Sequence, residues 1–138
     1  MPSRWLIKSE PTTYSWSRFL EEGRTRWDGV RSYEARNNLR AMRMDDLALF
    51  YHSNEGKAVV GVARVVATAY PDPTSDEDWS AVDFAPVVGL ERPVTLAEIK
   101  ETKALEEMKL LKQSRLSVVP VDPKEFALIL KMGKTRLK

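Results

Sequence analysis

Two apolar segments joined by a short polar turn constrain the fold of this chain more than any other feature. Residues 46–53 (DLALFYHS) carry apolar side chains on both faces of an extended strand, which predicts a buried strand. Residues 54–57 have turn chemistry, and residues 58–70 (AVVGVARVVATAY) form a valine-rich run typical of a second strand. We therefore expect the two segments to pair as a hairpin, with Gly61 at a bulge or bend that curves the sheet.

The remaining patterns predict an α+β fold. Strands are expected over residues 4–9, 80–90 (interrupted at Pro86) and 115–121, and helices over residues 12–22, 33–42, 103–111 and 123–132. Capping-box patterns at Thr95–Glu98 and Asp122–Glu125 each open a helix. Strands and helices do not alternate as in a parallel sheet, so a small, strongly bent, mostly antiparallel β-barrel decorated by short helices fits best. A chain of 138 residues with 43% apolar content predicts a single domain over residues 1–138, in which residues 133–138 are a basic tail expected to fray.

Composition excludes several function classes. The chain has no cysteine, which rules out disulfides, thiolate zinc sites and a cysteine nucleophile, and its single histidine makes a metal site improbable. An acidic loop with Asp72, Asp76 and Asp78 fails the calcium-loop pattern because Glu77 stands where glycine is needed, so a solvated loop is expected. Neither glycine-rich phosphate-binding pattern occurs, which argues against nucleotide hydrolysis. We expect no metal, no cofactor, no membrane segment and no signal peptide, and hence a soluble cytoplasmic protein.

The charge of the chain is unevenly distributed although its net value is only +2. Residues 1–44 hold nine Lys/Arg against five Asp/Glu, residues 71–107 hold three against ten, and residues 108–138 hold eight against two. If the two basic ends pack together they form a positive face that attracts phosphates. The alternative is a solvated surface with a chance asymmetry.

Two clusters of polar and aromatic residues are the candidate site. One is WLIKSEP at residues 5–11, on the first predicted strand, and the other begins at Trp27, which precedes a turn at Asp28 and Gly29. An indole beside a turn is suited to be a pocket wall, and a base stacked on it gains about 1–3 kcal/mol. Our hypothesis is that the two clusters face each other across one pocket.

At WLIKSEP, WDGVRSYEARNNLR, LFYHS, GVARV, AYPDPT and RLSVVPV the chain resembles the EVE domain family. The resemblance runs from about Trp5 to Val121, and it implies a PUA-like β-barrel related to YTH and ASCH domains and a reader of modified bases in DNA or RNA. Ser32 stands where the family commonly has Asn, and Asp45 where Gly is common. Carried over, the resemblance assigns the base pocket to Trp5, Lys8, Ser9, Glu10, Pro11, Trp27, Gly29, Val30, Tyr33, Asn37, His52 and Ser53, and the phosphate contacts to Arg31, Arg36 and Arg115.

The chemistry of these residues suggests how a base is read. Glu10 is a natural acceptor for the exocyclic amine of cytosine, main-chain groups of Lys8 and Ser9 hold the rest of the base edge, and Trp27 stacks on the ring. We therefore expect a non-catalytic nucleic-acid-binding module that reads one modified base, for example a methylated cytosine or adenine.

Two alternatives stay open. One is an enzyme acting on a nucleobase or RNA, with His52 and either Glu10 or Asp28 as acid and base, although no nucleophile, metal cluster or oxyanion motif can be assembled. His52 and Ser53 cannot act as a pair because neighbours on a strand point to opposite faces. The other is a small-molecule sensor that uses the same pocket. The choice of DNA or RNA, the preferred modification and the oligomeric state are open.

Overall fold

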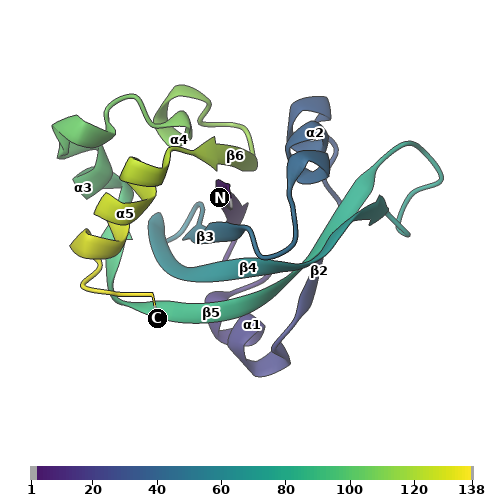
Figure 1. The fold of residues 1–138 in the computed structure, drawn as a ribbon, viewed down its shortest axis with the longest axis horizontal. Coiled ribbons are helices and arrows are strands. Elements are labelled where there is room, and N and C mark those ends of the chain that lie inside the picture. Colours follow the sequence, from purple (N-terminus) through teal and green to yellow (C-terminus); the bar gives the residue numbers. More distant parts are fainter. Residues whose placement is uncertain (1–2, 138) are drawn as a thin grey trace.

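A computed structural model, which describes residues 3–137, shows a strongly bent six-stranded sheet with short helices around it (Figure 1). The sheet order is β2-β5-β4-β3-β1-β6. The strands are β1 (Arg4–Ser9), β2 (Thr25–Trp27), β3 (Leu47–His52), β4 (Ala58–Pro71), β5 (Ser80–Thr95) and β6 (Val118–Val121). The helices are α1 (Trp16–Glu22), α2 (Tyr33–Ala41), α3 (Leu96–Glu101), the 3-10 turn η1 (Lys103–Leu105), α4 (Lys109–Lys112) and α5 (Pro123–Met132). Figure 1 shows α3, α4 and α5 gathered at one end of the sheet, at the left of the view.

Strand pairing confirms the predicted hairpin. β3 and β4 pair antiparallel, and β4 and β5 form a longer antiparallel pair. β1 is parallel to β3 and antiparallel to β6, which makes the sheet mixed. Within residues 3–137 no pairing joins β2 to β6, so the sheet is bent but does not close into the barrel we expected. The two edge strands have three and four residues, too few to complete a ladder around a barrel.

The bend of the sheet has identifiable causes along β4. The register of β4 against β5 shifts between Val59 and Gly61, as expected for a bulge near this glycine. A Cβ atom added to Gly61 would lie 2.4 Å from the Trp16 ring, so only glycine lets that indole lie directly on the strand. A second shift falls between Val62 and Ala63, opposite Pro86. β5 therefore continues through Pro86, where we expected a break, because the bulge accommodates a residue that has no N–H.

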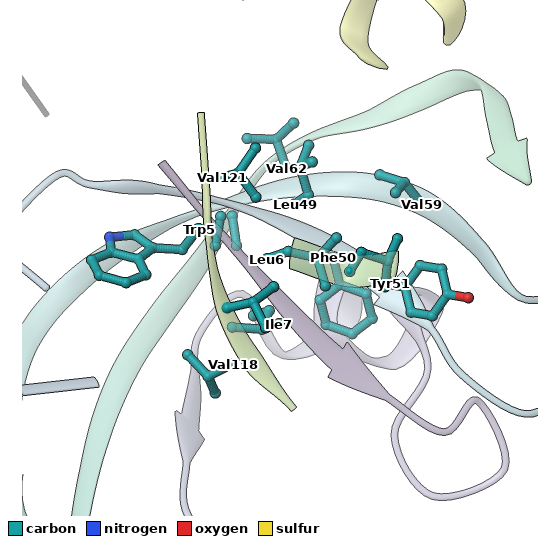
Figure 2. Close-up of a cluster of buried hydrophobic side chains, with 14 of the residues drawn as sticks. Trp5, Leu6, Ile7, Leu49, Phe50, Tyr51, Val59, Val62, Val118 and Val121 are labelled. Carbon is teal, nitrogen blue, oxygen red and sulfur yellow. The ribbon is translucent and has the colours of Figure 1, made fainter. Parts of the chain in front are cut away.

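The core lies between the inner strands, and Figure 2 shows its side chains converging from β1, β3, β4 and β6. Leu6, Ile7, Leu49 and Phe50 are fully buried. Each such side chain contributes roughly 1.5–3 kcal/mol through the water it releases. β1 is hydrogen-bonded on both sides, to β3 and β6, and its middle residues Trp5, Leu6 and Ile7 are buried, so the strand is a fixed base for the residues that follow it.

Local signals set the helix ends. Ser15 and Ser32 cap α1 and α2, and the two capping boxes form at the ends predicted for α3 and α5. Asp45, at the position where the family commonly has glycine, adopts a left-handed backbone with φ of 69°. The turn thus keeps the conformation that favours glycine, which Asp tolerates better than most residues.

Residues 133–137 of the basic tail are ordered where we expected the tail to fray, and Lys138 lies outside the described residues. The Arg92 N–H donates to the Gly133 carbonyl at 3.1 Å, and the Glu91 N–H donates to Thr135 Oγ1 at 2.9 Å. Leu137 is partly buried against the core. Residues 133–135 are thus held along β5. Across residues 3–137, no helix is both long and apolar enough to span a membrane.

Candidate functional site

A cavity of about 590 Å³ lies where the end of β1 meets β2 and the loop that follows it. We call it the Trp27 pocket. The structure brings both sequence clusters to it, with Lys8, Ser9 and Glu10 from one and Trp27 to Arg31 from the other. Its lining residues are Lys8, Ser9, Glu10, Thr13, Tyr14, Thr25, Arg26, Trp27, Asp28, Gly29, Val30, Arg31, Ser32, Arg115 and Ser117.

The indole of Trp27 is a fixed wall of this pocket. β2 pairs antiparallel with β5 and places Trp27 opposite Val82. The indole meets Phe50 and Phe84 edge to face, with ring centroids 5.7 and 5.8 Å apart, and meets Tyr14 at 6.4 Å. Edge-to-face contacts of this kind stabilise one ring orientation. Trp27 is half-buried and contributes to the lining of the pocket.

A buried carboxylate holds the loop after Trp27. Asp72 is 2% exposed, and its Oδ2 accepts the Gly29 N–H at 2.8 Å and Arg31 Nη1 at 3.0 Å. Burial alone would raise the pKa of Asp72, but the hydrogen bonds from Thr74, Gly29 and Arg31 outweigh it and hold this pKa well below its ordinary value. The ionised carboxylate therefore keeps Gly29, whose φ is 74°, and Arg31 in place at neutral pH.

Glu10 lines the same pocket with its carboxylate available. Its main-chain carbonyl accepts the N–H groups of Thr13 and Tyr14 at 2.9 and 2.8 Å, which fixes the turn after β1. Ser9 Oγ donates to the Tyr14 carbonyl at 2.6 Å and ties the same turn together. The side chain of Glu10 is exposed, and no group within residues 3–137 hydrogen-bonds to it. The Glu10 carboxylate is therefore a hydrogen-bond acceptor in the pocket that no residue in the range 3–137 uses.

Main-chain groups at the end of β1 already form hydrogen bonds within the protein. The Lys8 N–H donates to the Ser117 carbonyl at 3.0 Å, and the Ser9 carbonyl accepts the Ser53 N–H at 2.9 Å. We expected main-chain groups of Lys8 and Ser9 to hold the edge of a base. These two groups instead form hydrogen bonds within the protein. Lys8 Nζ donates to the Ser114 carbonyl at 2.7 Å, and burial lowers the pKa of Lys8.

Two of the three predicted phosphate contacts line the pocket. Arg115 is exposed and forms no hydrogen bond or ion pair with any residue in the range 3–137. Arg31 is 40% exposed beside Asp72. Arg36 lies elsewhere: its guanidinium bonds to Asn37 and to Asp78, and its side chain is only 16% exposed.

Trp5 and His52 have structural positions in place of the pocket positions we expected. Trp5 is 6% exposed, and its indole Nε1 donates to Asp46 Oδ2 at 2.9 Å inside the core. The backbone N–H of Trp16 donates to His52 Nε2 at 3.1 Å, so His52 accepts the first N–H of α1. Burial lowers the pKa of His52, which favours the neutral ring that can accept this bond.

Four further residues assigned to the pocket do not line it. Tyr33 and Asn37 lie on the exposed surface of α2, and Pro11 is in the turn beyond Glu10. Ser53 lines a second cavity of about 590 Å³, which we call the lysine cavity. That cavity is lined by Lys8, Tyr51, Ser53, Asn54, Lys57, Leu96, Lys100, Glu106, Leu110, Leu111 and Ser114.

Sequence reasoning missed Asp72, which we expected in a solvated loop. Its Oδ1 accepts Thr74 N–H at 2.7 Å and Thr74 Oγ1 at 2.6 Å, a turn in which an Asp side chain bonds two residues ahead. The sequence Asp72-Pro73-Thr74 carries that local signal. Nothing in the sequence, however, links it to Gly29 and Arg31, about 40 residues earlier. Within residues 3–137, no three His, Asp or Glu side chains are grouped as metal ligands.

The chain is similar in sequence to proteins of a known family. Residues 3–132 match the family model described as the EVE domain. Thymocyte nuclear protein 1 of Mus musculus is 37% identical over 171 residues, which covers 95% of this chain and 74% of that protein.

Solved structures agree with the fold. A crystal structure of a protein from Agrobacterium tumefaciens has a TM-score of 0.94 at 43% identity, covering 96% of this chain and 94% of that one. The human THYN1 protein in complex with 5-methylcytosine containing DNA has a TM-score of 0.89 at 36% identity, covering 97% and 99% of the two chains. A YTH domain of Zygosaccharomyces rouxii, at 18% identity and a TM-score of 0.63, shares the fold alone and covers 99% of this chain and 89% of that one. The fold is PUA-like, as expected.

Proposed function

The chain belongs to the EVE domain family, and on that premise we propose that it is a non-catalytic nucleic-acid-binding module that reads one modified base in the Trp27 pocket. The base we assign is a methylated cytosine. The human relative solved with 5-methylcytosine containing DNA, at 36% identity, supports this choice.

One observation carries the proposal: Trp27 and Glu10 line the same cavity, with Arg31 and Arg115 on its walls. The indole supplies a stacking surface that contributes about 1–3 kcal/mol per base. That gain offsets the few kcal/mol needed to unstack a base from a duplex. The Glu10 carboxylate accepts the exocyclic amine that cytosine carries and thymine lacks.

The arginines contribute affinity without selecting the base. Arg115 has no partner in the described chain and is free to contact a phosphate, whereas Arg31 is already oriented by Asp72. Contacts of guanidinium groups with phosphates position a strand and are sequence-independent. In the proposed complex, Trp27 and Glu10 select the base, and the arginines hold the strand that carries it.

No observation favours the enzymatic alternative. His52, its candidate base, is bound to the Trp16 N–H and does not line the Trp27 pocket. Of the two carboxylates that could act with it, Asp28 forms an ion pair with Arg26 Nε at 2.7 Å, and Glu10 lines a pocket that His52 does not. A binding function therefore accounts for the geometry without a chemical step.

The test is the affinity of the purified protein for short oligonucleotides that differ at one base. Fluorescence anisotropy with single-stranded and duplex DNA, carrying 5-methylcytosine, cytosine or thymine at the central position, gives three dissociation constants for each form of DNA under one salt condition. We expect the tightest binding to 5-methylcytosine. Equal affinity for all three would refute the reader function. Mass spectrometry of the incubated oligonucleotide, if it revealed a covalent change, would favour the enzyme instead.

A further inference from the structure

Two stacked aromatic rings lie on the surface beside the Trp27 pocket. Tyr33, at the first position of α2, and Trp79, just before β5, have ring centroids 5.3 Å apart and ring planes at 19°. Trp79 is half-buried, whereas Tyr33 is 69% exposed. A tyrosine stacked on one side and this exposed leaves much of its ring surface open. We call the two rings the Tyr33–Trp79 platform.

Guanidinium groups frame the platform. The Arg36 guanidinium carbon lies 5.1 Å from the Tyr33 ring centroid and 5.8 Å from that of Trp79, and the Arg31 guanidinium carbon lies 5.6 Å from the Trp79 centroid. Asp78 bonds to Arg36 and, at 2.5 Å, to Arg40. The rings and cations are therefore held in one arrangement before any ligand arrives. Cation–π contacts of this kind strengthen with desolvation.

The platform is continuous with the pocket through Arg31. Arg31 lines the Trp27 pocket and also lies over Trp79. Ser32, the next residue, lines the pocket as well and caps α2, of which Tyr33 is the first residue. A strand that leaves a base in the pocket and passes Arg31 therefore meets the platform next.

We propose that the Tyr33–Trp79 platform is a second binding site, which stacks the base next to the one held in the Trp27 pocket. This site rests on the proposed function and extends it from one nucleotide to two. It takes an unpaired base of any identity, because every base has a flat face and the Asp78 carboxylate beside the platform is already bonded to Arg36 and Arg40. Arg31 then lies between the two bases, where the connecting phosphate passes.

The experiment combines a protein variant with a change in the ligand. Single-stranded oligonucleotides carry a central 5-methylcytosine or cytosine, with either an intact base or an abasic residue at the 5′ or the 3′ neighbour. Dissociation constants are measured by fluorescence anisotropy for the wild-type chain, Tyr33→Ala and the matched control Tyr33→Phe, which keeps the ring. Circular dichroism verifies that each variant is folded.

We expect Tyr33→Ala to weaken binding about 5- to 100-fold for modified and unmodified strands alike. Tyr33→Phe should bind as the wild type does. An abasic neighbour on one side should weaken wild-type binding by a similar factor and have no further effect on Tyr33→Ala, because both changes remove the same stack.

Two results would overturn the second site: wild-type affinity in Tyr33→Ala, or equal losses from the abasic neighbours in the wild type and in Tyr33→Ala. The ratio of affinities for modified and unmodified strands reports the Trp27 pocket separately. If that ratio is one while the Tyr33 and abasic effects stay coupled, the base-reading proposal fails and the stacking site stands.

Discussion

The Trp27 pocket and the lysine cavity have the same volume, about 590 Å³, and share Lys8, yet their walls differ in kind. The Trp27 pocket carries an indole, the Glu10 carboxylate and the guanidinium groups of Arg31 and Arg115. The lysine cavity has three leucines in its lining, its tyrosine, Tyr51, is only 4% exposed, and its cations are lysines. Size alone therefore does not distinguish a binding site in this molecule.

What distinguishes the two is planarity and direction. A leucine side chain buries apolar area but has no flat face on which a base can stack, and an ammonium group is a point charge without the fixed fork of a guanidinium. The Trp27 pocket presents flat surfaces and directed donors and acceptors, so it can select among ligands of equal size. The variants below test that contrast by making the same kind of change in each cavity.

Removing the stacking ring should have the largest effect. Trp27→Ala should weaken binding of the 5-methylcytosine oligonucleotide about 5- to 100-fold, whereas Leu111→Ala in the lysine cavity should leave it unchanged. Anisotropy titrations below the melting temperature of each variant give the two constants. Because Trp27 also packs against Phe50 and Phe84, Trp27→Leu, which keeps apolar bulk without a flat ring, is the second variant. Wild-type affinity in Trp27→Leu would contradict the stacking role.

Neutralising the acceptor should change selectivity more than affinity. 5-Methylcytosine and thymine both carry a methyl group, and they differ in having an amine or a carbonyl opposite Glu10. A glutamine can turn its amide to donate to thymine, so Glu10→Gln should reduce the preference for 5-methylcytosine over thymine by about tenfold. Glu106→Gln, the matched change in the lysine cavity, should keep the wild-type ratio. A preserved ratio in Glu10→Gln would remove Glu10 from base selection.

The cations should contribute sequence-independent affinity at the Trp27 pocket only. Arg115→Ala should make the slope of log K against log salt less negative, by about 0.7 for single strands and about 0.9 for duplex DNA, because one phosphate contact is lost. Lys100→Ala, in the lysine cavity, should leave the slope as it is. Titrations at four salt concentrations measure both slopes. A shift of the same size in Lys100→Ala would show that nucleic acid covers both cavities.

The smallest effect is expected from pH. Burial lowers the pKa of His52 below 6.5, so the unfolded chain takes up this proton at a higher pH than the folded protein. The stabilising contribution is complete above about pH 6.5 and is lost as the pH falls toward the folded pKa. Urea denaturation at about pH 7.5 and about pH 5.5 should show lower stability at the acidic value.

His52→Gln supplies an acceptor that does not titrate, and it should reduce that difference. The protonated ring releases the start of α1, next to Tyr14 of the Trp27 pocket, so the acidic loss should be felt at that pocket. An identical pH difference in His52→Gln would assign it to other groups.

Features set by neighbouring residues were predictable from the sequence. β1 and α5 have the predicted bounds, and both capping boxes form, because a cap or a strand end depends on residues a few positions away. β2 was missed because a three-residue strand has no measurable alternation, and it exists through its pairing with β5. The parallel pairing of β1 with β3 was also missed, because the sequences of two buried strands do not reveal which strand each will pair with.

The candidate site was likewise predictable only in part. Glu10 and Trp27 were predicted to face each other, and the structure places both on one cavity. Tyr33 was assigned to that cavity and Arg36 to a phosphate contact, yet they are three residues apart on α2 and share a face that packs beside Trp79. The partner that fixes them lies more than 40 residues further along the chain, beyond the reach of local patterns.

The central position of β1 has a consequence for how the protein is made. One side of β1 pairs with β3, but the other side pairs with β6, which is synthesised more than 100 residues after β1. During synthesis the first strand therefore presents an uncovered row of amide and carbonyl groups until residue 121 has emerged, and such an edge invites association with other chains. We expect nascent chains in which Val118–Val121 is still inside the ribosome to depend on chaperones more than chains in which this strand has emerged.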